Sequence, residues 1–408
     1  MQRRDYVKTA GCVASVLGLA GCNGIFAGSD GDTGSVTIGL QADLTGQFAN
    51  IGFWHDRVAN AYVEHLRDSE DFDHEIELEV ADTATDPSQG VQAMRDLAQQ
   101  EGVDVVIGSQ NSGIAISSTQ VARETDTPYL SIAQAPSITG EDGNRWVVRH
   151  AEDVIQYARR SVEYGVDNLG ERWTILYQDY SFGQQFNAAL QEMLPEAGAD
   201  VLESISVQQG ATELTSQLNS VPDETEVLFA AVVPPSSLSF LGQSAENDTP
   251  GERFGAIQSV ETVDVSSIGP PAESARFISP MPRRLSELDT EGHQQMLDLA
   301  NIDGTDTPRL SHMVWSYECV SLVADALDNS DWTGDNGQAF IEWIESEPSL
   351  DEELRYPQGA KSYRAEDHQA FVPLYLEQIE DGELQLLNTY ESEEPSGESE
   401  VDFTTQSF

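Results

Sequence analysis

The chain has 408 residues, of which 71 are Asp or Glu and 20 are Lys or Arg, so its formal net charge is −51 at pH 7. Because a surface this acidic repels other anions, nucleic acid and anionic membrane surfaces are poor candidates as binding partners. A chain of this length can bury a large core, and three cysteines are too few for a disulfide framework.

The first residues predict an export signal. Arg3 and Arg4 precede an apolar stretch that is too short to span a membrane and that ends in Leu-Ala-Gly-Cys at Cys22. The segment RRDYVK resembles a twin-arginine signal, and LAGC resembles a lipobox, whose cysteine is lipidated. We expect a signal peptide at 1–21, a lipid on Cys22 and a tether at 22–35, with the folded part on the extracellular face of the membrane. An uncut, membrane-anchoring N-terminal helix is the alternative.

Beyond the tether, short apolar segments alternate with segments of helical periodicity. Two long helices are predicted at 50–68 and 181–198. The predicted strands are VTIGL (36–40), EIELEVA (75–81), VDVVIG (103–108), TPYLSI (127–132), WTILYQ (173–178), VLESISV (201–207), VLFAAVV (227–233) and RFISP (276–280). This alternation predicts an α/β fold with parallel central sheets in two Rossmann-like lobes, separated near RWVVRHAED (145–153).

One strand-to-helix junction has two interpretations. The segment VIGSQNSGIAIS (106–117) passes from an apolar strand through small polar residues into a helix. Ser112 can simply cap that helix, since serine is a favoured cap residue. Alternatively, the exposed N–H groups of the helix start bind an anion beside its hydroxyl.

Sequence signals for catalysis are weak. The closest histidines, His55, His65 and His74, are ten and nine residues apart, which is not metal-ligand spacing, and no GxSxG, GxGxxG or GxxxxGK[ST] motif occurs at a predicted strand-to-helix junction. Asp82 and Asp86 fit a loop and a helix cap better than a cation site. Cys319 lies in the apolar helical pattern MVWSYECVSLVADAL and is expected to be buried. We therefore predict no enzyme, no cofactor and no metal.

Several segments in order resemble one protein family. They include VTIGLQADLTGQFANIGFWHDRVANAYVEHL, ADTATDPSQGVQAMRDLAQQEGVDVVIGSQNSG, PYLSIAQAPSIT and ILYQDYSFGQQF. Together they are similar to type I periplasmic binding proteins, and most of all to leucine/isoleucine/valine-binding proteins of ABC importers. The resemblance covers about residues 36–390. The acidic excess and the presence of only two lysines also resemble proteins of salt-loving archaea.

The resemblance implies two lobes that flank a ligand cleft and are joined by three hinge crossings, near Arg149, near Pro280 and between Tyr356 and Ala370. The first lobe would comprise 36–149 and 281–355. The second lobe would comprise 150–280 and 356–390 and would include a terminal pair of strands. Residues 391–408, which are rich in Ser and Glu, are expected to be a disordered acidic tail.

The resemblance also implies the ligand contacts. Ser112 matches the family's carboxylate-binding serine, Ala133 and Gln134 match the next contact loop, Phe182 matches the aromatic wall, and Ile51 matches an apolar residue over the ligand. The family's acidic anchor for the ligand's amino group falls on Gln258, with Glu261 three residues later. If Gln258 faces the ligand, an amide, urea or simple carboxylate is implied, because a neutral amide does not compensate a buried ammonium. If Glu261 faces it, an amino acid is implied.

The implied mechanism is capture and delivery. The lobes close on a small polar ligand, foremost a branched-chain or related amino acid, and the closed form docks on an ABC permease. A lipid at Cys22 would keep the protein near that permease. The alternative is a sensor, in which the same fold reports ligand occupancy to a signalling partner.

Overall fold

The computed structural model describes residues 35–282, 290–302, 310–392 and 399–408. The predicted signal peptide, Cys22 and nearly all of the tether lie outside the described residues. All of the described residues belong to one compact unit. No helix among them is long and apolar enough to cross a membrane.

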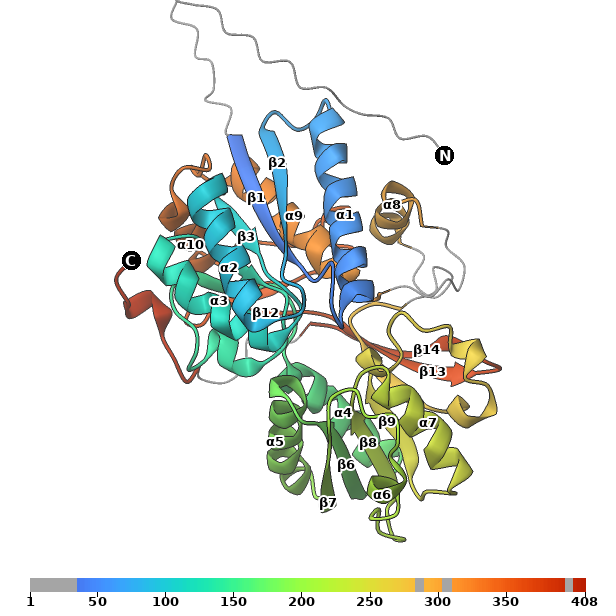
Figure 1. Cartoon of the computed structure of the whole chain (residues 1–408). Coiled ribbons are helices and arrows are strands. Elements are labelled where there is room, and N and C mark those ends of the chain that lie inside the picture. The colour runs from blue at the N-terminus through green and yellow to red at the C-terminus, as the bar shows by residue number, and fades with distance from the viewer. Residues whose placement is uncertain (1–34, 283–289, 303–309, 393–398) are drawn as a thin grey trace, which may run out of the picture. The chain divides into compact units, whose positions relative to one another are not determined.

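The first lobe is built on a seven-stranded sheet with the order β11-β12-β5-β4-β3-β1-β2 (Figure 1). Its strands are β1 (Ser35–Ala42), β2 (Glu75–Asp82), β3 (Val105–Ile107), β4 (Tyr129–Ser131), β5 (Val147–Arg149), β11 (Ser362–Arg364) and β12 (Gln369–Phe371). Its main helices are α1 (Ala49–Asp68), α2 (Pro87–Asp96), α3 (Ser112–Thr125), α8 (Glu291–Leu299), α9 (Met313–Asn329) and α10 (Gly337–Glu345). All strand pairs are parallel except β11 with β12.

The second lobe is built on another seven-stranded sheet, with the order β14-β13-β10-β9-β8-β6-β7 (Figure 1). Its strands are β6 (Arg172–Gln178), β7 (Asp200–Val207), β8 (Val227–Ala231), β9 (Glu252–Ala256), β10 (Arg276–Ser279), β13 (Leu374–Glu380) and β14 (Glu383–Tyr390). Its helices are α4 (Val154–Asn168), α5 (Ser181–Glu196), α6 (Thr215–Leu218) and α7 (Ser236–Glu246). Only β13 and β14 run antiparallel to their neighbours. The predicted α/β class and all eight predicted strands are confirmed.

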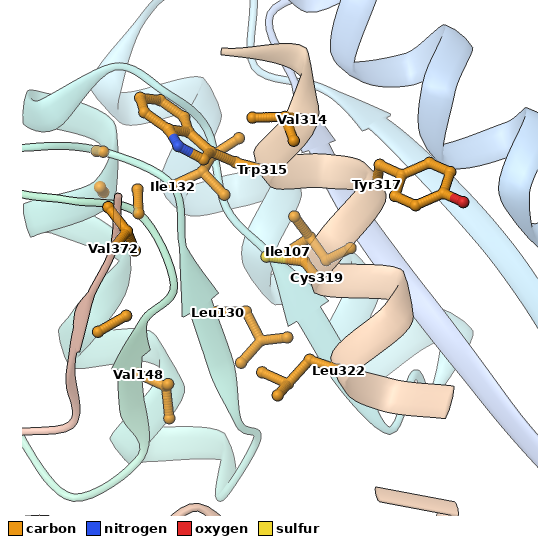
Figure 2. Close-up of a cluster of buried hydrophobic side chains, with 14 of the residues drawn as sticks. Ile107, Leu130, Ile132, Val148, Val314, Trp315, Tyr317, Cys319, Leu322 and Val372 are labelled. Carbon is orange, nitrogen blue, oxygen red and sulfur yellow. The ribbon is translucent and has the colours of Figure 1, made fainter. Parts of the chain in front are cut away.

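The central strands of the first lobe are apolar on both faces because both faces are buried in its core. Figure 2 shows Ile107, Leu130 and Val148, from β3, β4 and β5, beside side chains of α9. Helices cover both faces of a parallel sheet, so such strands lack an exposed polar face. Cys319 of α9 is wholly buried, and burial raises the pKa of its thiol well above the usual value. It is a core residue and is unsuited to nucleophilic chemistry.

The predicted third crossing was wrong. The segment after Tyr356 stays with the first lobe, because β11 and β12 form a hairpin whose second strand pairs with β5. The chain passes to the second sheet only between Phe371 and Leu374. Residues 356–371 therefore belong to the first lobe and not to the second.

The prediction of a disordered tail was also wrong for residues 399–408. Phe403 is 1% exposed, and its backbone N–H donates to the carbonyl of Glu366 at 2.6 Å. The terminal Phe408 lies under the guanidinium of Arg145, with 3.8 Å between that group and the ring centre, and meets Trp146 edge to face. Aromatic burial on the first lobe therefore orders residues 399–408.

Candidate functional site

One cavity collects residues from both lobes and encloses about 680 Å³ of space not filled by protein atoms, part of it open to solvent. Most of its lining follows the carboxyl ends of strands β3, β4, β6, β8 and β9, where open parallel sheets bind ligands. The first lobe contributes Gln47, Phe48, Asn50, Ile51, Gln110, Ser112 and Gln134, and the second contributes Tyr180, Phe182, Val233, Pro234, Gln258, Glu261 and Thr262. None of these residues is basic, and Glu261 is the only acid among them.

The structure brings six of the seven predicted ligand contacts to this cavity, and the lining includes both Gln258 and Glu261. Ala133 is the exception, since it is wholly buried and does not line the cavity. Its backbone N–H donates to the hydroxyl of Ser131 at 3.2 Å. The loop therefore presents Gln134 to the cavity and turns Ala133 inward.

Ser112 is the first residue of α3 and does not cap it. The cap is Asn111, whose side-chain oxygen accepts from the backbone N–H groups of Gly113 at 3.0 Å and Ile114 at 3.3 Å. The Ser112 side chain is therefore not needed as the cap and lines the cavity at the positive end of a 14-residue helix. This arrangement suits a carboxylate or another anionic oxygen.

Gln110 supplies a second donor beside Ser112. Its side-chain oxygen lies 3.0 Å from Nε2 of His55, and Nδ1 of His55 lies 2.8 Å from the hydroxyl of Ser316. Burial lowers the pKa of His55 to about 4, so the ring is neutral near pH 7. The amide oxygen can only accept, so Nε2 carries the proton and the hydroxyl of Ser316 donates to Nδ1. The amide N–H groups of Gln110 are then left for a ligand oxygen.

Two aromatic side chains from the start of α5 form an apolar wall. The rings of Tyr180 and Phe182 lie 6.0 Å apart, and Phe182 also packs edge to face on Phe186 at 5.7 Å. Burial raises the pKa of the Tyr180 hydroxyl. Phe48 and Ile51, at the start of α1, contribute apolar surface from the first lobe. The cavity can therefore hold an aliphatic or aromatic body.

Gln258 provides an acceptor on the second lobe. Its Nε2 donates to Oε1 of Gln134 at 2.6 Å, and Nε2 of Gln134 in turn donates to Oε1 of the buried Glu152 at 3.4 Å. This chain fixes the orientation of both amides. Oε1 of Gln258 is buried and has no hydrogen-bond partner among the described residues, so it is available to a ligand donor.

Glu261 provides a second acceptor on the same lobe. Its Oε2 accepts the backbone N–H of Ser311 at 2.8 Å. Its Oε1 lies 2.9 Å from Nδ1 of His312, close enough for an ion pair, but the angles do not make a hydrogen bond. One carboxylate oxygen is therefore hydrogen-bonded, whereas the other lies beside an imidazole nitrogen and keeps acceptor capacity.

Sequence reasoning missed Gln110, Tyr180 and the Ser311–His312 pair. Gln110 and Tyr180 each follow a predicted strand end, two residues before Ser112 and Phe182 respectively, so position alone could have found them. Ser311 and His312 reach Glu261 from 50 and 51 residues away in sequence, and no local pattern signals that contact.

The other sequence candidates have structural roles. Asp86 caps α2 by accepting the N–H of Gln89 at 3.0 Å. Asp82 accepts backbone N–H groups of Leu44, Thr45 and Ala84. Within the described ranges, no group of three or more His, Cys, Asp or Glu side chains is placed to hold a metal ion.

Comparisons with known proteins concern the family and the fold of the chain. A family model described as periplasmic binding protein matches residues 35–383. The Leu/Ile/Val-binding protein homolog 7 of Brucella melitensis is 22% identical over 322 residues, which cover 74% of this chain and 79% of that protein.

Solved structures share the fold at low sequence identity. A solute-binding protein of an ABC transporter from R. palustris, in complex with 4-hydroxybenzoate, superposes with a TM-score of 0.76 at 17% identity, covering 88% of this chain and 97% of that one. A leucine-binding protein from Thermotoga maritima superposes with a TM-score of 0.73 at 16% identity, covering 87% and 99%.

Proposed function

Because the chain belongs to the periplasmic binding protein family, we propose that it is the solute-binding protein of an ABC importer and captures a small carboxylate with an apolar body and a hydrogen-bond donor. An amino acid of the branched-chain type is the first candidate. The lobes close on this ligand and present it to the permease, because a ligand that contacts both lobes stabilises the closed form.

The proposal rests on one observation: the cavity has hydrogen-bond donors at one end and acceptors at the other. Donors gather on the first lobe, at Ser112, Gln110 and the start of α3. The second lobe offers Oε1 of Gln258, which has no hydrogen-bond partner among the described residues, and the carboxylate of Glu261, whose Oε1 lies beside His312. An α-amino acid carries a carboxylate for the first set and an ammonium for the second. The charge of Glu261 supplies the Coulomb attraction that an ammonium needs when it leaves water.

A hydroxylated aromatic acid is the second candidate, and the aromatic wall favours it. Tyr180, Phe182 and Phe48 present rings that can pack on a benzene ring. A phenolic hydroxyl would donate to Oε1 of Gln258. The R. palustris protein in the comparisons holds 4-hydroxybenzoate, so the fold accommodates such a ligand.

Binding in molar KCl distinguishes the candidates, since salt at that concentration screens the strong self-repulsion of the chain. We would measure thermal stabilisation and calorimetric affinity with leucine, 4-methylpentanoate, leucinamide, 4-hydroxybenzoate and urea. A bound ligand raises the melting temperature by mass action. Leucine binding more tightly than both leucinamide and 4-methylpentanoate supports the amino-acid proposal. Preference for 4-hydroxybenzoate supports the second candidate, and stabilisation by none contradicts both.

We also propose that the protein is held at the outer face of the membrane by a lipid on Cys22, in a sequence that resembles a lipobox. Mass spectrometry of the membrane-extracted protein should find a modified Cys22 at the N-terminus. Cys22→Ala should release the protein from the membrane fraction. An unmodified, membrane-bound chain that begins at Met1 would support an uncut N-terminal helix instead.

A further inference from the structure

The acidic end of the cavity is assembled from both lobes. Glu261 belongs to the second lobe, shortly after the 3-10 turn Ile257–Ser259 that follows β9. The groups that contact its carboxylate belong to the first lobe, where the backbone N–H of Ser311 lies 2.8 Å from Oε2 and His312 Nδ1 lies 2.9 Å from Oε1. The orientation of this carboxylate therefore depends on residues of the other lobe.

His312 is itself held in place from two sides. It is wholly buried, and its Nε2 lies 3.2 Å from the hydroxyl of Tyr157. Its ring meets Trp315 edge to face at 4.4 Å, and the indole N–H of Trp315 donates to Glu152 at 3.1 Å. These contacts fix the position of the imidazole ring. The ring therefore restricts rotation of the Glu261 carboxylate and does not move together with it.

We propose that His312 is a positioning residue that decides ligand specificity by aiming Oε1 of Glu261 at the ligand's donor group. This inference rests on the proposed function. Ser311 donates to one carboxylate oxygen and His312 lies 2.9 Å from the other, so the orientation of the Glu261 carboxylate is fixed. Its Oε1 keeps acceptor capacity on the wall that also carries Oε1 of Gln258, which has no hydrogen-bond partner among the described residues. Because the two acceptor oxygens are already fixed in place, binding an ammonium does not cost the entropy of ordering their side chains.

A consequence is that the ammonium anchor is complete only when the lobes meet. With the lobes apart, Glu261 loses both Ser311 and His312, and its carboxylate is free to rotate into water. A ligand without the donor group would not gain from the assembled anchor. Closure would therefore select for ligands that carry both a carboxylate and a donor.

A simpler role for His312 makes a different prediction. If the Glu261–His312 contact only holds the lobes together, its loss weakens closure around every ligand by the same factor. The two roles are separated by comparing leucine with 4-methylpentanoate, which is leucine without its amino group. A purely structural contribution leaves the ratio of the two affinities unchanged.

The test is calorimetric titration of the full mature chain with both ligands in molar KCl. His312→Phe keeps a ring against Trp315 and removes both nitrogens. We expect it to weaken leucine binding at least tenfold and 4-methylpentanoate binding by less than about twofold. His312→Asn returns an N–H near the position of Nδ1 and should restore leucine affinity to within about threefold. If His312→Phe does not fold, His312→Met receives the same comparison.

His55→Leu is the matched control, since His55 is a buried histidine that supports Gln110 at the carboxylate end. His55→Leu should weaken the binding of leucine and of 4-methylpentanoate by a similar factor. Equal weakening of both ligands by His312→Phe, or no weakening of either, overturns the inference while the proposed function stands. A wild-type protein that does not bind leucine overturns the amino-acid candidate on which this inference rests, and this is seen before any variant is made.

Discussion

Nε2 of Gln258 in the second lobe lies 2.6 Å from Oε1 of Gln134 in the first lobe, so one hydrogen bond between two cavity side chains joins the lobes directly. Both side chains are nearly buried, at 6% and 3% exposure. A hydrogen bond in such a place is shielded from competing water, and losing one partner leaves the other unsatisfied. The cavity wall is therefore also part of the contact that holds the lobes together.

Gln258→Leu should shift the ligand-free protein toward an open form. The leucine keeps the approximate volume but leaves Oε1 of Gln134 without its donor, at a cost of about 1 kcal/mol or roughly fivefold in the closing equilibrium. Small-angle scattering in molar KCl should show a larger radius of gyration. Gln191→Leu, on the exposed side of α5, is the control. An unchanged radius in Gln258→Leu would show that other contacts hold the lobes closed.

Ser112→Ala should weaken every carboxylate ligand. The lost bond is charge-assisted, so the expected cost is about 1–3 kcal/mol, or roughly 5- to 150-fold in the dissociation constant. The cap residue Asn111 is untouched, so stability should change little. Ser117→Ala is a control on the same helix, because its hydroxyl donates to the carbonyl of Gly113. Equal affinities of wild type and Ser112→Ala in calorimetry would remove Ser112 from the site.

Acid should destabilise the protein through His55. Burial lowers the pKa of this imidazole to about 4, whereas the unfolded chain has the usual value near 6.5. Between these values the unfolded state binds a proton that the folded state does not, so stability falls as pH decreases from about 6.5 to 4. The full effect is about 3 kcal/mol.

The measurement is urea denaturation of wild type and His55→Gln at pH 7 and pH 4.5. His55→Gln should lose less stability between the two pH values, because the titrating group is gone. His65→Gln, a less buried histidine on the same helix, should keep the wild-type difference. If His55→Gln also keeps that difference, His55 is not the group responsible.

Much of the site could be predicted from the resemblance to a known family, whose ligand contacts match positions at the ends of parallel strands. Ser112, Gln134 and Phe182 each follow a short apolar strand that the sequence shows clearly. The contact between Glu261 and His312 could not be predicted, since tertiary packing brings two distant loops together. Whether Gln258 or Glu261 faces the ligand also could not be decided, and the structure places both at the cavity.

The errors in the fold have local causes. Strands β11 and β12 have only three residues each, which is too short for an alternating pattern to be recognised in the sequence. The C-terminal segment was judged by its average composition, which hides the two aromatic anchors Phe403 and Phe408. The burial of these two large side chains determines the structure of the C-terminal segment, and average composition does not reveal such burial.

Phe403→Ala should test whether the C-terminal segment contributes to stability. Deleting a buried phenyl ring costs about 3–5 kcal/mol in a core. The cost here should fall at or below the lower end of that range, because a terminal segment can detach without global unfolding. Thermal denaturation should show a lower melting temperature, and hydrogen exchange should rise across 399–408. Thr405→Ala, an exposed change in the same turn, is the control. Wild-type stability and exchange in Phe403→Ala would contradict the anchoring role.

Lys361 forms a buried ion pair whose contribution to stability should be larger and less dependent on salt than that of an exposed ion pair. Its Nζ lies 2.8 Å from Oε2 of Glu318, and both side chains are 0% exposed. Lys361→Met leaves Glu318 buried without its cation, which costs about 3–5 kcal/mol, whereas Lys361→Met with Glu318→Leu should recover most of that loss. Urea denaturation measures both changes.

The loss in Lys361→Met should also be the same at 1 M and 3 M KCl, because salt does not screen a pair that solvent cannot reach. Arg95→Met, which breaks the exposed pair between Arg95 and Glu124, should cost less than about 1 kcal/mol at either concentration. If the double variant is as unstable as Lys361→Met, the loss does not come from an uncompensated Glu318. If the loss in Lys361→Met shrinks as salt rises, water and ions reach the pair, and its burial does not shield it.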